Sequence, residues 1–274
     1  MKNKRQYSID FNLDNTKISD LIVTDMCNMN CPFCIASYML NRVHKKMSVE
    51  DVRDWAIPQL KAAGITHIGI SGGEPSLLLE LPEICKMLYE VGFNVNIASN
   101  GYSIDILRQC SQYINYVSLS LNSLSTKQVN EIDDALSCQL RLHGLIWKGH
   151  NDNINSIVDI CSALNDDIIV DFSTLRTTNL WASAVDNLDI TRTNKFIVDH
   201  VIPESCIEEM SKSTIVMENG YISKLDINGK HINIFLRDKT SNEIYEPTDK
   251  QLILTFDRKM YYGFNEMIRD FNRQ

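Results

Sequence analysis

Three cysteines lie close together near the start of the 274-residue chain, at positions 27, 31 and 34. Thiolates are soft ligands that suit iron–sulfur clusters or zinc. A [4Fe–4S] cluster normally takes four cysteine ligands, so three thiolates on one short loop leave one iron with an open position for a substrate or cofactor. The alternative is a structural zinc site completed by His44, although zinc sites usually pair two Cys-x2-Cys knuckles and this loop has one.

A second loop, Ser71 to Leu77, contains Gly72, Gly73 and Glu74. Two glycines let the backbone approach a ligand closely and expose its amide and carbonyl groups. A carboxylate in such a loop can receive an ammonium group through charge-assisted hydrogen bonds. A Gly-Gly pair alone is usually only a turn. Its place after the next strand-like segment beyond the cysteine loop indicates one shared site.

Both loops belong to a regular alternation of strand-like and helix-like segments. The expected strands cover residues 21–23, 66–70, 93–98, 116–121, 139–147 and 168–175, and the expected helices 49–63, 81–91, 104–111, 126–137 and 153–164. Parallel strands need crossover connections, so this alternation predicts a parallel sheet covered by helices. Six units are too few for a closed eight-stranded barrel. We therefore expect an α/β fold, a partial (β/α)6 TIM barrel.

The pattern changes after residue 180. A helix is expected within residues 194–210, and short strands at 214–217, 221–227, 231–236, 251–256 and 259–264. Asn228-Gly229 is a strong hairpin signal. We expect residues 214–264 to form a small antiparallel sheet. The expected organisation is an N-terminal extension over 1–18, a barrel core over 19–180, and a helix plus antiparallel β extension over 181–274 that covers the barrel opening.

The Cys-x3-Cys-x2-Cys spacing, with an aromatic residue before the last cysteine, and the Gly-Gly-Glu-Pro loop together resemble the radical S-adenosylmethionine (radical SAM) superfamily. The resemblance extends from Leu21 to about Arg176. It implies a radical SAM barrel with two cofactors, one [4Fe–4S] cluster and S-adenosyl-L-methionine. In this family the open iron chelates the amino and carboxylate groups of S-adenosylmethionine. Reductive cleavage then gives methionine and a 5′-deoxyadenosyl radical that takes a hydrogen from the substrate.

The resemblance also implies roles for individual residues. The metal ligands are, by position, Cys27, Cys31 and Cys34. Phe33 matches the aromatic residue that shields the cluster near the adenine. The loop that binds the methionine amino group is Gly72, Gly73 and Glu74. Polar residues at later strand ends, which bind the ribose hydroxyls and the methionine carboxylate, are Ser99, Asn100, Ser120 and Asn122. Each of these four is equally well explained as a turn residue, and Asn122 stands where many relatives have Asp.

The end of the fifth strand, Gly144 to Gly149, resembles the family's Gly-x-Ile-x-Gly-x-x-Glu element, but the second glycine comes one place late and the glutamate is absent. Ile146 is either an adenine contact or a core residue. The loop that follows, Gly149 to Asn153, is similar to that of the molybdenum-cofactor branch, so the resemblance implies this branch as the nearest subgroup. Arg176 and Lys148 are candidates to bind a carboxylate or phosphate of the substrate, and a surface salt bridge is the alternative for Arg176.

Many relatives carry a C-terminal extension with further clusters. After Arg176 this chain has one cysteine, Cys206, so an auxiliary cluster is not expected. We expect an oxidoreductase or lyase that acts on a small molecule or nucleotide and is reduced by a donor such as flavodoxin or ferredoxin. One alternative is the same chemistry on a peptide or tRNA. Another is a non-enzymatic zinc or iron–sulfur sensor.

Composition sets the remaining expectations. The net charge of −8 gives no general attraction to a phosphate backbone, which argues against non-specific nucleic-acid binding. No apolar run approaches the roughly 20 residues that span a bilayer. The polar N-terminus lacks the apolar stretch of a secretory signal. We therefore expect a cytoplasmic protein whose cysteines serve as thiols or metal ligands.

Overall fold

The structure is a computed structural model that describes residues 17–34, 36–37, 39–121, 124–174, 195–196, 199–200, 205, 215–216, 223–227, 230–235 and 251–272. Its strands form one 11-stranded sheet in the order β11-β10-β1-β2-β3-β4-β5-β6-β9-β8-β7. Strands β1 to β6 are parallel and neighbour each other in chain order. This open parallel sheet confirms the predicted partial barrel.

The six parallel strands are β1 (Ile18–Thr24), β2 (His67–Gly72), β3 (Asn94–Ser99), β4 (Tyr116–Ser120), β5 (Gln139–Ile146) and β6 (Ile169–Thr174). The α-helices between them are α1 (Val49–Asp51), α2 (Ile57–Ala62), α3 (Leu81–Glu90), α4 (Ile104–Cys110), α5 (Thr126–Ala135) and α6 (Ile154–Ser162). A π-helical turn, η1 (Val52–Ala56), joins α1 to α2, and a short 3-10 helix, η2 (Pro75–Leu77), follows β2. The sequence predicted each of these strands and α-helical segments to within a few residues.

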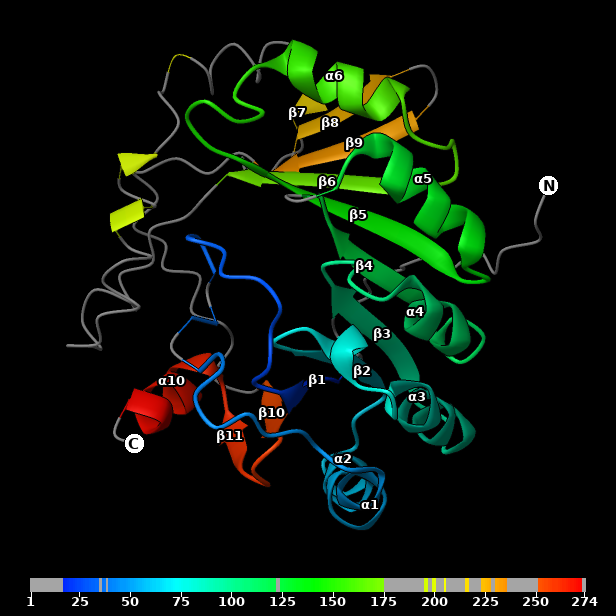
Figure 1. Ribbon diagram of the computed structural model, residues 1–274, viewed down its shortest axis with the longest axis vertical. Coiled ribbons are helices and arrows are strands. Elements are labelled where there is room, and N and C mark those ends of the chain that lie inside the picture. The colour runs from blue at the N-terminus through cyan, green and yellow to red at the C-terminus, as the bar shows by residue number, and fades with distance from the viewer. Residues whose placement is uncertain are drawn as a thin grey trace.

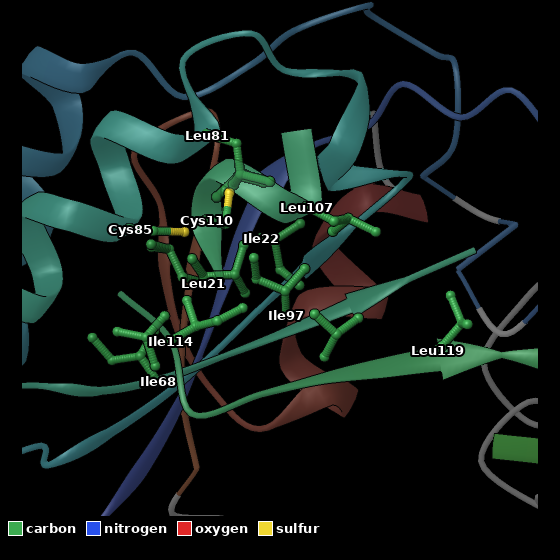
Figure 2. Packing of buried hydrophobic residues seen from close by; sticks show 14 of the residues in the cluster. Leu21, Ile22, Ile68, Leu81, Cys85, Ile97, Leu107, Cys110, Ile114 and Leu119 are labelled. Carbon is green, nitrogen blue, oxygen red and sulfur yellow. The ribbon is translucent and has the colours of Figure 1, made fainter. Parts of the chain in front are cut away.

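The sheet bends, and helices α3 to α6 cover its outer face (Figure 1). Alternate residues of each strand point to this side. Ile68, Ile97 and Leu119 are fully buried there, and Ile97 lies near Leu107 of α4 (Figure 2). The opposite face, which we call the concave face, carries the intervening residues of each strand. The main core therefore lies between the sheet and its helices.

Two sequence features explain the first helical segment. Ser48 caps α1 through a capping box in which its hydroxyl accepts from Asp51 N–H and the Asp51 carboxylate accepts from Ser48 N–H. Pro58 lies in the first turn of α2 and has no N–H to donate. Just before it, Ile57 N–H bonds to Val52 O, five residues back, so the chain widens into the π turn. The segment remains one continuous helical rod.

The C-terminal strands do not form the separate sheet that the sequence predicted. Strands β7 (Ile215–Val216), β8 (Ser223–Ile227) and β9 (Lys230–Phe235) form antiparallel pairs, and β9 joins the main sheet parallel to β6. Strands β10 (Leu252–Thr255) and β11 (Met260–Tyr262) also pair antiparallel, but β10 lies parallel to β1 at the other edge. The antiparallel pairs were predicted correctly, whereas their grouping was wrong because each edge strand of the barrel takes its own partner.

The last helix, α10 (Phe264–Asn272), was not predicted. Phe264 begins this helix instead of ending a strand. Met267, Ile268 and Phe271 are buried on one side of it, at the spacing of an amphipathic helix. Arg42 Nη1 donates to Phe271 O at 2.9 Å, which ties the helix to the segment after the cysteine loop. The helix expected within 194–210 lies mostly outside the described residues.

Within the described ranges, no helix has the length and apolar character that crossing a bilayer requires.

Candidate metal and cofactor site

The three predicted ligands lie on the loop that leaves the C-terminal end of β1. Cys27, Cys31 and Cys34 are free thiols, each partly buried. A turn bond from Cys34 N–H to Cys31 O, at 3.1 Å, folds the loop so that the last two cysteines stay close. The loop therefore presents three soft donors from one short segment, which suits three corners of an iron–sulfur cluster.

Asp25 and Asn41 hold the two ends of this loop. The buried Asp25 carboxylate accepts three backbone N–H groups, from Val43 at 2.8 Å, His44 at 3.1 Å and Lys45 at 2.7 Å. Asn41 clamps the Cys27 backbone from both sides, because its Oδ1 accepts Cys27 N–H at 2.9 Å and its Nδ2 donates to Cys27 O at 3.2 Å. These bonds fix the residue that begins the ligand set.

The glycine loop after β2 packs directly on the backbone that leads into Cys27. Gly73 N–H donates to Thr24 O and Glu74 N–H donates to Met26 O, both at 2.8 Å. A Cβ on Gly73 would lie 2.0 Å from Met26 O. A Cβ on Gly72, whose φ is +138°, would lie 2.4 Å from Thr24 O. Both glycines are required by contact between two backbone segments, and this contact places Glu74 beside the cysteine loop.

Glu74 is almost completely buried, and donors from the end of β3 hold its carboxylate. Oε1 accepts Ser76 N–H at 3.0 Å and the Ser99 hydroxyl at 2.7 Å. Oε2 accepts Asn100 N–H at 2.6 Å. An ionised carboxylate has about four acceptor positions, so three donors leave capacity for a further one. Asn100 also reaches the cysteine loop, because its Nδ2 donates to Asn28 Oδ1 at 3.0 Å.

The electrostatics of the thiols follow from this packing. Burial raises the pKa of Cys27, Cys31 and Cys34, and for Cys34 it raises the pKa to about 11. The nearby carboxylate of Glu74 also raises the pKa of Cys27. The free thiols are therefore protonated at neutral pH. Metal binding needs thiolates, so loading this site releases protons.

Phe33 extends from the cysteine loop to the end of β5. Its ring centroid lies 5.3 Å from that of Trp147 and 6.2 Å from that of Phe196. Trp147 stacks on His150 with a centroid distance of 3.9 Å, and Phe196 stacks on His200 at 4.0 Å. The predicted shielding residue is thus part of an aromatic cluster that joins three segments of the chain.

The remaining predicted residues are placed unequally. Ser120 is the last residue of β4 and is partly buried. Ile146, at the end of β5, is fully buried in the same alternation as Leu140 and Leu142, and this placement favours core packing. Lys148 is exposed, and its backbone N–H bonds to His200 O at 3.0 Å. Asn122 and Arg176 lie outside the described residues.

The donor set suits a cluster. Three free thiols stand beside a buried carboxylate that retains acceptor capacity. In a cubane each thiolate binds a different iron, so the ligands need not meet at one point. In the described part of the chain, no three His, Cys, Asp or Glu side chains converge on a position for a single metal ion. His44, the expected fourth zinc ligand, is exposed.

The residues that hold the cysteine loop could not be recognised from a sequence motif. No sequence motif marks Asp25, Asn28 or Asn41. Asp25 and Asn41 also bind backbone groups that lie far from them along the chain. The available signal was the type of residue, since Asp and Asn side chains commonly bind backbone N–H groups.

Comparisons with known proteins identify the family of the chain. The sequence profile of the radical SAM superfamily matches residues 21–170. A protein named S-adenosylmethionine-dependent nucleotide dehydratase, from Lacinutrix mariniflava, is 29% identical over 116 residues, which cover 40% of this chain and 24% of that protein. The PqqA peptide cyclase of Methylobacterium nodulans is 23% identical over 163 residues, which cover 52% of this chain and 42% of the cyclase.

Among solved structures, Streptococcus suis SuiB bound to S-adenosylmethionine superposes with a TM-score of 0.55 at 15% identity, over 91% of this chain and 60% of SuiB. That likeness shows the shared fold. The chain spans about a quarter to two fifths of the length of the two curated relatives. Because the profile covers more than half of the sequence, the chain belongs to the radical SAM superfamily, whose members bind a [4Fe–4S] cluster and S-adenosylmethionine.

Proposed function

We propose that this chain is a radical S-adenosylmethionine enzyme in which Cys27, Cys31 and Cys34 hold the [4Fe–4S] cluster. One observation carries the proposal. The hydrogen bond from Glu74 N–H to Met26 O brings a buried carboxylate next to the residue that precedes Cys27. When bound, the reduced cluster supplies one electron to the sulfonium of S-adenosylmethionine, which yields methionine and a 5′-deoxyadenosyl radical.

The chain's own residues bind and orient the cofactor in this proposal. Glu74 receives the methionine ammonium group with its remaining acceptor capacity. Ser99 and Asn100 hold Glu74 in place through the bonds described above. Ser120 and Asn122 are proposed to bind the ribose hydroxyls or the methionine carboxylate, and Phe33 to shield the cluster. For Ile146, the complete burial of the side chain supports packing more than an adenine contact.

We propose a small molecule or nucleotide as the substrate, with Lys148 and Arg176 as candidates to bind its acidic groups. The relatives include a nucleotide dehydratase and a peptide cyclase, so a peptide substrate is the second candidate. An external donor such as a flavodoxin or ferredoxin is proposed to reduce the cluster. We also propose a cytoplasmic location, because a cluster held by cysteine thiolates suits a reducing compartment in which cysteines do not form disulfides.

The division into residues 1–18, 19–180 and 181–274 also stays a proposal. The bond from Arg42 to Phe271 supports a C-terminal segment that covers the side of the barrel carrying the cysteine loop. Such a cover would exclude water and stray hydrogen donors from a radical.

The test is anaerobic reconstitution with iron and sulfide, followed by S-adenosylmethionine and dithionite. We expect about four irons per chain and formation of 5′-deoxyadenosine. The Cys31→Ala variant should lose both, whereas Cys161→Ala, which changes a buried cysteine of α6, should keep both. One zinc per chain and no 5′-deoxyadenosine would instead support a structural or sensor protein.

A further inference from the structure

The concave face of the barrel is mostly polar, although Leu145 and Ile169 also lie on it, and it carries no net charge over β2 to β6. These five strands contain one basic residue of permanent charge, Arg141, and one acidic residue, Asp171. The two form an ion pair between Arg141 Nε and Asp171 Oδ2. Asn233 of β9 donates to Asp171 Oδ1 at 2.7 Å, and the Tyr116 hydroxyl hydrogen-bonds Arg141. Each charge is therefore neutralised within the protein.

Strand alternation places a second set of polar groups on the same face. Val117, Leu119, Leu140 and Leu142 are buried on the helix-covered face. The residues between them and their counterparts on β6 face the concave side, and they are Ser118, Ser120, Arg141, His143, Asp171 and Ser173. Ala98, the register neighbour of Ser118 on β3, is exposed, so a molecule can approach the face there.

His143 lies beside Ser120, one of the proposed cofactor residues. Its register partners are Ser120 on one side and Asp171 on the other. Ser173 Oγ lies 3.4 Å from its Nε2. The side chain is only partly buried, and burial lowers its pKa, an effect that Arg141 reinforces and Asp171 opposes. The ring is therefore neutral at pH 7, with one nitrogen that donates and one that accepts.

We propose that this face binds an uncharged, hydroxyl-bearing part of the substrate, such as a sugar ring, and that His143 hydrogen-bonds one of its hydroxyls. This inference rests on the proposed function and names the substrate class for the same site. A carboxylate or phosphate would need an unneutralised cation, and Arg141 is held by Asp171. A hydroxyl both donates and accepts, so it matches serine hydroxyls and a neutral imidazole equally well.

The experiment measures binding without turnover. The reconstituted protein, with 13C-labelled histidine and saturating S-adenosylmethionine but no reductant, is titrated with uridine, octanoate and trialanine, and the histidine ring resonances are followed by NMR. The His143 resonance is assigned with His143→Asn. We expect uridine to shift it, and His143→Asn to weaken uridine binding at least tenfold. His67 is the first residue of β2, at the end of the strand away from the glycine loop. His67→Asn should therefore leave uridine binding unchanged.

Any of three results would overturn the inference. Uridine does not bind, or it binds equally well to His143→Asn. In the third case, octanoate or trialanine shifts the His143 resonance and uridine does not. His143→Gln keeps a polar group at this position and serves as a second variant, with circular dichroism and iron content as checks of folding. Binding of S-adenosylmethionine is measured on the same samples. Loss of that binding in the unsubstituted protein contradicts the proposed function, whereas its retention without uridine binding contradicts only the present inference.

Discussion

The Ser99 hydroxyl donates to Glu74 Oε1 at 2.7 Å, so the end of β3 fixes the carboxylate that follows β2. Asn100 N–H adds a bond of 2.6 Å to the other oxygen. Because Glu74 N–H is itself bonded to Met26 O, the carboxylate is tied to two neighbouring strands and to the start of the cysteine loop. The Glu74 carboxylate is therefore held at a fixed position relative to the cysteine loop, which suits a cofactor that binds both an iron and an ammonium acceptor.

Glu74→Gln should weaken S-adenosylmethionine binding by about 10- to 100-fold, because hydrogen bonds to a charged group contribute about 1.5–3 kcal/mol. The new amide also directs N–H groups toward the donors that now serve the carboxylate. Equilibrium dialysis of the reconstituted protein measures the effect. The matched control is Glu83→Gln on the exposed surface of α3, and equal affinity in the two variants would contradict the assignment.

Gly73→Ala should destabilise the fold by about 3 kcal/mol or more, because its Cβ would meet a backbone carbonyl that cannot rotate away. Gly92→Ala is the control, since a Cβ there meets nothing within 4 Å. The alanine would be strained only by the positive φ of +99° at this position. That conformation costs about 1–2 kcal/mol. Urea unfolding compares the two, and an equal loss of stability would show that the contact with Met26 is relieved cheaply.

Asp25→Asn should loosen the cysteine loop, because one of the two oxygens that receive three backbone N–H groups becomes a donor. We expect a loss of about 2–3 kcal/mol in stability and faster loss of iron on anaerobic gel filtration. Asp134→Asn, at an exposed position of α5, is the control. Iron retention that matches this control would mean that Asp25 does not support the ligand loop.

Asp20 on β1 predicts a pH effect on stability. Burial raises the pKa of its carboxyl to about 6, although Gln251 Nε2 donates to Oδ2 at 2.6 Å. Between the unfolded pKa, about 4, and 6, the folded state binds the extra proton, so stability falls as pH rises through this window.

Asp20→Asn cannot ionise, so it should remove this decline and stabilise the protein at pH 7 by about 2–3 kcal/mol. Urea unfolding at pH 4.5 and pH 7 tests this directly. A substitution that changes stability equally at both pH values would contradict a raised pKa.

The parallel half of the fold was predictable because its signals are local. Each strand and helix from β1 to β6 has its own pattern of apolar residues, and several of the helices have a side-chain cap, such as the capping box at Ser48. The C-terminal strands were harder to predict, since the pairing of β9 with β6 and of β10 with β1 depends on contacts between residues distant in sequence. Helix α10 did carry a readable signal in Met267, Ile268 and Phe271.

In the candidate site, too, local motifs were predictable and contacts between distant residues were not. The cysteines and the glycine loop form contiguous motifs, so they were found from sequence. The clamp by Asp25 acts on backbone N–H groups 18 to 20 residues away, and the bond from Asn100 to Asn28 crosses 72 residues. Only the folded chain brings such partners together. The glycines also had a different reason from the expected one, since their close contact is with the β1 backbone.

The most direct test of a cluster with one open iron is electron paramagnetic resonance of the anaerobically reconstituted, dithionite-reduced protein with and without S-adenosylmethionine. We expect a [4Fe–4S]⁺ signal that changes when S-adenosylmethionine is added to the unsubstituted protein. In Glu74→Gln, the same concentration of S-adenosylmethionine should leave the signal unchanged. A signal that S-adenosylmethionine does not alter in the unsubstituted protein, or a protein that takes up zinc and gives no signal, would contradict this expectation.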